Sequence, residues 1–265
     1  MDNKNNLDRQ PVISLKNIGL SYTANKKSRY DALTDINLDI YKNDFVCVLG
    51  KSGCGKSTLL NIIAGFLMPT TGTAEILGKP IKGPDKNRAV VFQNATLYPW
   101  LSTYDNIAFG LRMRKLPAEQ IRQTTEKYMK SVGLSDFANN KPYELSGGMR
   151  QRAALARALS NEPEIILMDE PFGALDALTR VKMQGLVRGI RKENGNTMFM
   201  ITHDVDEAMT LANRIIILSN RPGTIVRTFD IDFCDRIKNA GDDDIKYSEE
   251  YRLIRNEILD IINED

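Results

Sequence analysis

A glycine-rich phosphate loop is the clearest chemical feature of this 265-residue sequence. Gly50 to Ser57 read Gly-Lys-Ser-Gly-Cys-Gly-Lys-Ser, a full match to the pattern that wraps nucleotide phosphates. The apolar run Phe45–Leu49 precedes it and the helical stretch Ser57–Ala64 follows, which is the context the pattern requires. Backbone N–H groups can then surround phosphate oxygens, while Lys56 reaches the β- and γ-phosphates. The residues expected to bind nucleotide here are Gly50, Lys51, Ser52, Gly53, Cys54, Gly55, Lys56, Ser57 and Thr58.

An Asp-Glu pair follows a second apolar run, Ile165–Met168. Asp169 at a strand end can hold Mg²⁺, together with the Ser57 hydroxyl, and Glu170 can act as a general base on water attacking the γ-phosphate. The alternative is a structural acidic pair, which would face an arginine or a helix N-terminus. The sequence therefore predicts a magnesium site and a catalytic carboxylate side by side.

Two more polar residues come directly after apolar runs. Gln93 follows Ala89–Phe92, and His203, the one histidine of the sequence, comes two residues after Met198–Ile201. Because ligands of open α/β sheets gather at the carboxyl ends of the strands, we expect both near the phosphate loop. For His203 the alternative is an ordinary core or surface histidine.

A second helix N-terminus that could bind an anion lies far along the sequence from the phosphate loop. Ser146, Gly147 and Gly148 precede the helical stretch Met149–Leu159, in a region without strand signals. One chain therefore carries what look like halves of two different sites.

The elements that must position these residues indicate an α/β protein. Short apolar runs, including Ile215–Leu218, are typical of buried parallel strands, and the pattern over 178–194 predicts a helix. Alternating residues at 13–18 and 36–40 predict an antiparallel β-subdomain. Segments such as Pro117–Val132 predict an inserted helical subdomain over about 94–160. The main domain is expected over 12–230.

The remaining tail, 231–265, contains an amphipathic helix carrying Tyr251, Ile254, Ile258 and Ile261. Packing against the body of the protein is the favoured interpretation of its apolar face, and partner binding is the alternative.

The order of the motifs resembles the nucleotide-binding subunit of an ABC transporter. Leu145 to Arg152 read Leu-Ser-Gly-Gly-Met-Arg-Gln-Arg, between the phosphate loop and the Asp-Glu pair. The resemblance covers about residues 12–230 and implies a P-loop NTPase core of the ABC ATPase fold, with ATP and Mg²⁺ as cofactors. It implies that Gln93 touches Mg²⁺ or the attacking water, and that His203 contacts the γ-phosphate.

The same resemblance implies a platform for adenine and a second copy of the chain. Tyr22 would stack on the base, with Tyr30 as a competitor. Ser146, Gly147 and Gly148 would meet the γ-phosphate bound to the opposite subunit, and Asp176 would lie in the loop that crosses between subunits. Since one complete set of motifs is present, a homodimer is expected, or a heterodimer with a similar chain.

Met149 departs from the common pattern, because many members carry Gln there. Together with the segments Leu97–Leu101 and Pro171–Asp176, it resembles the nitrate, sulfonate and taurine importer branch. Small oxyanions are therefore the expected cargo, with a pyrimidine-type vitamin precursor as the alternative. Trp100 would lie where the permease docks, with burial in this chain's own core as the alternative.

Composition limits the other functions. Lys and Arg number 36 against 34 Asp and Glu, so no dense basic surface favours nucleic acid as a partner. Cys47, Cys54 and Cys234 have no metal-ligand spacing and are expected to be free thiols. The polar first ten residues lack a signal-like segment, and no apolar run approaches ~20 residues. We therefore expect a peripheral subunit on the cytoplasmic face of the membrane, working with a permease and, indirectly, an extracytoplasmic binding protein.

Two other classes are less well supported. A DNA-repair ATPase of this type would need a long heptad insertion between Gln93 and Leu145, and translation factors usually carry two cassettes. A nucleotide-binding regulator without turnover is disfavoured by the joint presence of Glu170 and His203.

Overall fold

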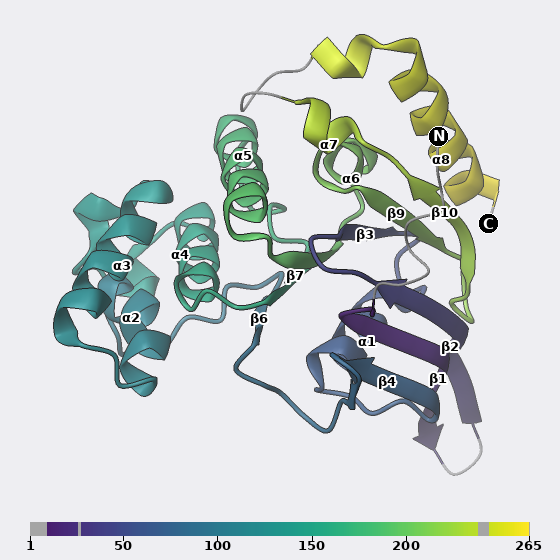
Figure 1. Ribbon diagram of the computed structural model, residues 1–265, viewed down its shortest axis with the longest axis horizontal. Coiled ribbons are helices and arrows are strands. Elements are labelled where there is room, and N and C mark those ends of the chain that lie inside the picture. The colour runs from purple at the N-terminus through teal and green to yellow at the C-terminus, as the bar shows by residue number, and fades with distance from the viewer. Residues whose placement is uncertain (1–9, 26–27, 238–243, 265) are drawn as a thin grey trace.

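The computed structural model describes residues 10–25, 28–237 and 244–264 (Figure 1). The polar amino terminus up to residue 9 lies outside the described residues. The expected α/β class is confirmed: strands and helices alternate along the chain, and the strands form one mixed sheet and one antiparallel sheet.

Within the described part of the chain, the larger sheet has six strands in the order β10-β9-β3-β8-β7-β6. Its strands are β3 (Phe45–Leu49), β6 (Arg88–Val91), β7 (Ile165–Asp169), β8 (Thr197–Ile201), β9 (Arg214–Leu218) and β10 (Ile225–Asp230). All but β10 run parallel, and β10 pairs antiparallel with β9 at one edge. The five predicted strands are thus present, although β6 at the sheet edge is only partly buried, whereas β10 was not predicted.

Side chains of β3 explain why these runs are apolar throughout. Phe45, Cys47 and Leu49 enter one core, together with side chains from the helices on that face. Val46 and Val48 enter a second core on the opposite face, shared with α1 (Lys56–Ala64) and the antiparallel sheet. Since both faces of the strand are covered, both sets of positions must be apolar.

The antiparallel sheet has the order β2-β1-β4-β5. Its strands are β1 (Ile13–Asn25), β2 (Ser28–Ile40), β4 (Thr71–Ile76) and β5 (Lys79–Pro80). The alternating segments at 13–18 and 36–40 do pair antiparallel, as predicted. β4 and β5 come after the phosphate loop and were missed, because Thr71–Ile76 has short polar residues and few apolar ones to mark it.

Helices α2, α3 and α4 contact one another and form the lobe at the left of Figure 1. The helices of the described chain, beyond α1, are α2 (Thr103–Met113), α3 (Ala118–Ser131), α4 (Gly147–Ser160), α5 (Ala177–Asn194), α6 (Val205–Leu211), α7 (Phe233–Arg236) and α8 (Glu249–Glu264). Short 3-10 turns occupy Ser135–Phe137, Pro142–Glu144 and Asp244–Tyr247. The helical character predicted after residue 103 is therefore observed.

The C-terminal helix α8 packs on the body of the protein, against α6 and β9 (Figure 1). Tyr251 and Ile258 are fully buried, and Ile254 and Ile261 are partly buried against the same core. Packing, the favoured interpretation of this apolar face, is confirmed.

The three cysteines are free and buried, as expected from their spacing. Burial raises the pKa of the Cys47 and Cys234 thiols, so both are stable as neutral thiols. Of the helices that the structure describes, none combines the length and apolar character needed to cross a bilayer.

Candidate functional site

The phosphate loop joins the end of β3 to the start of α1. Gly53 and Gly55 have φ angles of 82° and 104°, in the region that glycine alone enters without strain. At Gly55 a Cβ would also lie 2.8 Å from the carbonyl oxygen of Ala32, so both backbone angle and space require glycine. This turn brings the loop over the positive end of α1, where backbone N–H groups can bind an anion.

Lys56 lies across the loop. Its ammonium donates hydrogen bonds to the carbonyl oxygens of Gly50 (2.7 Å) and Lys51 (2.9 Å), and its side chain is buried. Cys54 is buried beneath the same ammonium, with Sγ 3.8 Å from Nζ. The lysine is therefore held where phosphate oxygens would enter the loop.

A cavity of about 660 Å³ opens beside this loop, a volume typical of a small-molecule site. The predicted site residues that line it are Tyr22, Gly50, Ser52, Gly53, Gly55, Lys56, Ser57, Thr58, Gln93, Asp169, Glu170 and His203. Apart from Tyr22 of β1, they come from the ends of four strands and the first turn of α1, so the fold gathers residues that span positions 22 to 203 of the sequence. Lys51 and Cys54 belong to the loop but do not line the cavity.

Asp169 ends β7 next to the loop. Burial raises the pKa of its carboxyl, the Ser57 hydroxyl that hydrogen-bonds to it acts in the opposite direction, and Glu170 raises it further. A cation beside this carboxylate would favour its charged form, as the Lys56 ammonium already does. Among the described residues, no group of three or more His, Cys, Asp or Glu side chains is arranged so that it could hold a metal ion. One carboxylate and one hydroxyl fit Mg²⁺, which takes the rest of its oxygen ligands from phosphates and water.

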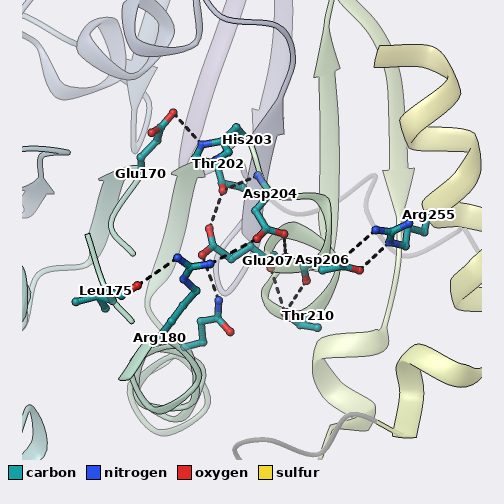
Figure 2. Close-up of polar contacts among 11 residues, drawn as sticks. Glu170, Leu175, Arg180, Thr202, His203, Asp204, Asp206, Glu207, Thr210 and Arg255 are labelled. Carbon is teal, nitrogen blue, oxygen red and sulfur yellow. Dashed lines mark hydrogen bonds and ion pairs between the residues drawn. The ribbon is translucent and has the colours of Figure 1, made fainter. Parts of the chain in front are cut away.

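Glu170 meets Gln93 and His203 at the same edge. The amide Nε2 of Gln93 donates to Glu170 Oε2 at 2.9 Å. On the other side, Nδ1 of His203 lies 3.4 Å from Glu170 Oε1, the contact drawn in Figure 2. Glu170 itself has a φ of 45°, and its N–H donates to the carbonyl oxygen of Ile201 at 2.9 Å. Its partners are thus a glutamine and a histidine in the cavity rather than an arginine or a helix N-terminus, which goes against the structural alternative.

Two tyrosines form one wall of the cavity. The rings of Tyr22 and Tyr30 lie 5.5 Å apart with a 30° tilt, and the Tyr22 hydroxyl is 3.4 Å from Thr58 Oγ1. Either ring could stack on a nucleobase, so the choice between them stays open at this point.

Ser146, Gly147, Gly148 and Asp176 lie outside this cavity. Ser146 caps α4 by accepting a hydrogen bond from the Met149 N–H at 3.2 Å, and Asp176 caps α5 by accepting one from Thr179 at 3.0 Å. Ser146, Gly147 and Asp176 are exposed. Within one chain the structure therefore does not bring the second set of predicted residues to the first.

Arg221 was missed by the sequence analysis. Its Nε donates to the Gly53 carbonyl oxygen at 2.8 Å, its guanidinium lies 5.8 Å from the Tyr30 ring centre, and it lines the cavity. It follows the predicted strand Ile215–Leu218 by three residues, so the rule that placed Gln93 and His203 could have found it.

Trp100 lies on the surface of the helical lobe, with 69% of its side chain exposed and its ring 5.5 Å from that of Tyr98. The alternative that it is buried in the chain's own core is wrong. The segment after Gln93 is loop, and the packed interior of this lobe is filled instead by side chains of α2, α3 and α4.

Comparisons with known proteins agree with this geometry. The family model described as "ABC transporter" matches residues 33–173. The taurine import ATP-binding protein TauB of Jannaschia sp. (strain CCS1) is 44% identical over 250 residues, covering 94% of this chain and 93% of that protein. TauB of Rhizobium johnstonii is 45% identical over 233 residues, covering 88% and 89%.

Solved structures show the same fold. The ATP-binding cassette MJ0796, in a dimeric post-hydrolysis state bound to ADP and Pi, superposes with a TM-score of 0.76 at 34% identity. The alignment covers 83% of this chain and 98% of the cassette. Another dimeric structure of the same cassette gives 0.77 at 36% identity.

Proposed function

Because the chain belongs to the ABC transporter family and is an ATP-binding ATPase of that family, we propose that it is the ATP-binding subunit of an importer for taurine or a similar small sulfonate. The names of its relatives support the cargo, and the branch features Met149 and Pro171–Asp176 point the same way. A pyrimidine-type vitamin precursor and a non-transport ABC ATPase are the alternatives. The ATPase domain spans 12–230 in this proposal, with 94–160 as the inserted helical subdomain and 231–265 as the tail.

The contact of Glu170 with Gln93 and His203 carries the proposal. Glu170 is the general base that orients and activates water, and His203 contacts the γ-phosphate as charge develops on it. Gln93 positions the water beside Glu170. These three side chains reach one point from three different strand ends, which a structural acidic pair would not require.

The nucleotide is held by the loop. Backbone N–H groups from Gly50 to Thr58 bind the phosphates, Lys56 neutralises the β- and γ-phosphates, and Tyr22 supplies the base platform. Ser57, Asp169 and Gln93 would hold Mg²⁺, which when bound neutralises phosphate charge as the γ-phosphoryl group departs.

A second copy completes the site. Ser146, Gly147 and the partly exposed Gly148 form a helix start outside the cavity of their own chain, and Asp176 lies exposed at the start of α5. In the proposed homodimer, these groups cover the γ-phosphate bound by the other copy. The dimeric state of the MJ0796 cassette supports this arrangement.

The remaining partners follow from the importer assignment. We infer a membrane permease bound on the cytoplasmic face, and an extracytoplasmic binding protein reached only through it. The exposed Trp100, adjacent to the segment that follows Gln93, is the proposed anchor for the permease. Nucleic acid is no part of this proposal.

Uptake measurements test the cargo. Cells of the native host carrying either the wild-type chain or the Lys56→Ala variant are supplied with labelled taurine, an alkanesulfonate, nitrate or a pyrimidine vitamin precursor. Wild-type cells should take up taurine or the alkanesulfonate, and Lys56→Ala cells should not, because the variant cannot hold the phosphates. Loss of uptake confined to the vitamin precursor would select that alternative, and unchanged uptake of all four would contradict the importer assignment.

A further inference from the structure

A buried carboxylate lies directly behind the His203 loop. Glu207 is on α6, four residues after His203, and only 6% of the residue is exposed. Its Oε2 accepts a 2.6 Å hydrogen bond from the Thr202 hydroxyl, and its Oε1 accepts one from Gln184 Nε2 at 3.2 Å. Neither oxygen reaches the cavity described above.

The contacts of Glu207 fix the residues on both sides of His203 (Figure 2). The Thr202 oxygen accepts a hydrogen bond from the Asp204 N–H at 3.1 Å, and the Asp204 carboxylate accepts one from the Glu207 N–H at 3.0 Å. Thr202, Asp204 and Glu207 therefore form a closed ring of hydrogen bonds around the backbone of His203. The histidine side chain, in contrast, is 70% exposed and must depend on its backbone for placement.

The same ring extends to helix α5. Gln184 belongs to α5, and Arg180, also on α5, lies 4.0 Å from Asp204 and donates to the carbonyl oxygen of Leu175 at 3.2 Å. Leu175 directly precedes Asp176, the exposed residue that caps α5. A continuous set of polar contacts thus joins the His203 loop to the segment proposed to face the second copy (Figure 2).

Stability alone does not account for an acid at this position. Burial raises the pKa of Glu207, with the Thr202 hydrogen bond acting in the opposite direction, so ionising it here is costly. Replacing a buried charged group by an apolar side chain of similar volume is often neutral or stabilising. What an apolar side chain cannot do is accept hydrogen bonds from two donors on different elements.

We propose that Glu207 is a positioning residue for hydrolysis: it holds the His203 loop in register with Glu170 and ties that loop to α5 through Gln184, alongside the Asp204–Arg180 contact that leads to Leu175 just before α5. The proposal rests on the role of His203 proposed above. It predicts that Glu207 affects the turnover rate and leaves nucleotide binding unchanged, because Glu207 does not touch the cavity.

The test compares Glu207→Leu, Glu207→Gln and Thr202→Val in the full-length protein, using steady-state ATPase rates and the affinity for a fluorescent ATP analogue. Glu207→Leu should lower kcat by about 10- to 100-fold, with the affinity within about twofold of wild type. In Glu207→Gln the amide oxygen can still accept from the Thr202 hydroxyl, and its NH2 group can donate to Gln184 once that amide turns to present its oxygen, so this variant should recover most of the rate. Thr202→Val should reproduce the loss, and the double variant Thr202→Val/Glu207→Leu should be no slower than either single variant.

Asp206→Asn is the matched control, because Asp206 is on the same helix but bonds Tyr251 and Arg255 of α8 instead of the His203 loop. It should leave kcat unchanged.

His203→Ala separates the two proposals. If His203→Ala hydrolyses ATP normally, the role of His203 fails; if His203→Ala is inactive while Glu207→Leu and Thr202→Val turn over within twofold of wild type, only the present inference is overturned. A rise in the ATP-analogue Kd that equals the fall in kcat would also overturn it.

Discussion

The carboxyl edge of the six-stranded sheet and the start of α4 differ in the contacts that their predicted site residues make within one chain. At the sheet edge, Lys56 and Glu170 already contact their partners around one cavity. At the start of α4, the Ser146 side chain accepts a hydrogen bond from its own helix, and Ser146 and Gly147 are exposed. The first region is a cavity that the chain builds alone, while the second is an exposed surface that does not line that cavity. The two regions should therefore respond differently to mutation.

The largest effect is expected at the sheet edge. Glu170→Gln should lower kcat by about 10²- to 10⁴-fold, since it removes the proposed general base, while ATP affinity stays within about threefold. Phosphate release and equilibrium binding of ATP measure the two quantities. Turnover indistinguishable from that of wild type would eliminate the assignment.

A smaller loss, of about 10²-fold in turnover, is expected from Ser146→Arg. A long side chain at the start of α4 should block the second copy, yet leave ATP binding to a single chain unchanged. Mixing it with Lys56→Ala should restore activity, because a mixed dimer contains one site with neither lesion.

Ser102→Arg is the control for that experiment, because Ser102 caps α2 in the same lobe through the Asp105 N–H. Both variants should lose about 1 kcal/mol of stability with the cap, but Ser102→Arg should keep its ATPase rate. Equal losses of activity in the two variants would show that only the cap matters.

A moderate effect on affinity should distinguish the two tyrosines. Tyr22→Ala should weaken ATP binding by about 1–3 kcal/mol, the range for loss of one base-stacking ring, and Tyr30→Ala should cost less. Tyr22→Phe keeps the ring and loses only the 3.4 Å contact with Thr58, so its affinity should match wild type. The reverse order in the titrations would make Tyr30 the platform.

The smallest effect concerns α8. Burial acts to raise the pKa of Asp206, but the hydrogen bonds from Arg255 and Tyr251 outweigh it and hold that pKa below its ordinary value. A carboxyl whose folded pKa lies below the unfolded value of about 3.9 stabilises the protein above that pH, and loses this contribution as the pH falls through the folded pKa.

Arg255→Ala should therefore lower the free energy of unfolding by about 0.2–1 kcal/mol at pH 7, since the pair is partly exposed. In urea titrations the difference from wild type should shrink between pH 5 and pH 2. A difference that grows on acidification would contradict the assigned direction of the Asp206 pKa.

The sheet edge was predictable from the sequence because its strands are buried on both faces. Such strands appear as unbroken apolar runs, and Gln93, Asp169 and His203 stand at or just beyond their ends. Other features depend on contacts between distant segments and could not be predicted. They are the order of the strands in the sheet, the positive φ of Glu170 and the hydrogen bond from Arg221 to Gly53. The contacts of Glu207 could not be predicted either, because the sequence shows it only as one acidic residue among many.

The most direct test of the shared site is sedimentation of Glu170→Gln with and without ATP, next to the double variant Glu170→Gln/Ser146→Arg. If the start of α4 in one copy covers ATP held by the other, Glu170→Gln should shift from the mass of one chain to that of two when ATP is added. The double variant should bind ATP equally well and remain a single chain. A Glu170→Gln protein that stays monomeric with ATP bound, or a double variant that dimerises as readily, would contradict the account.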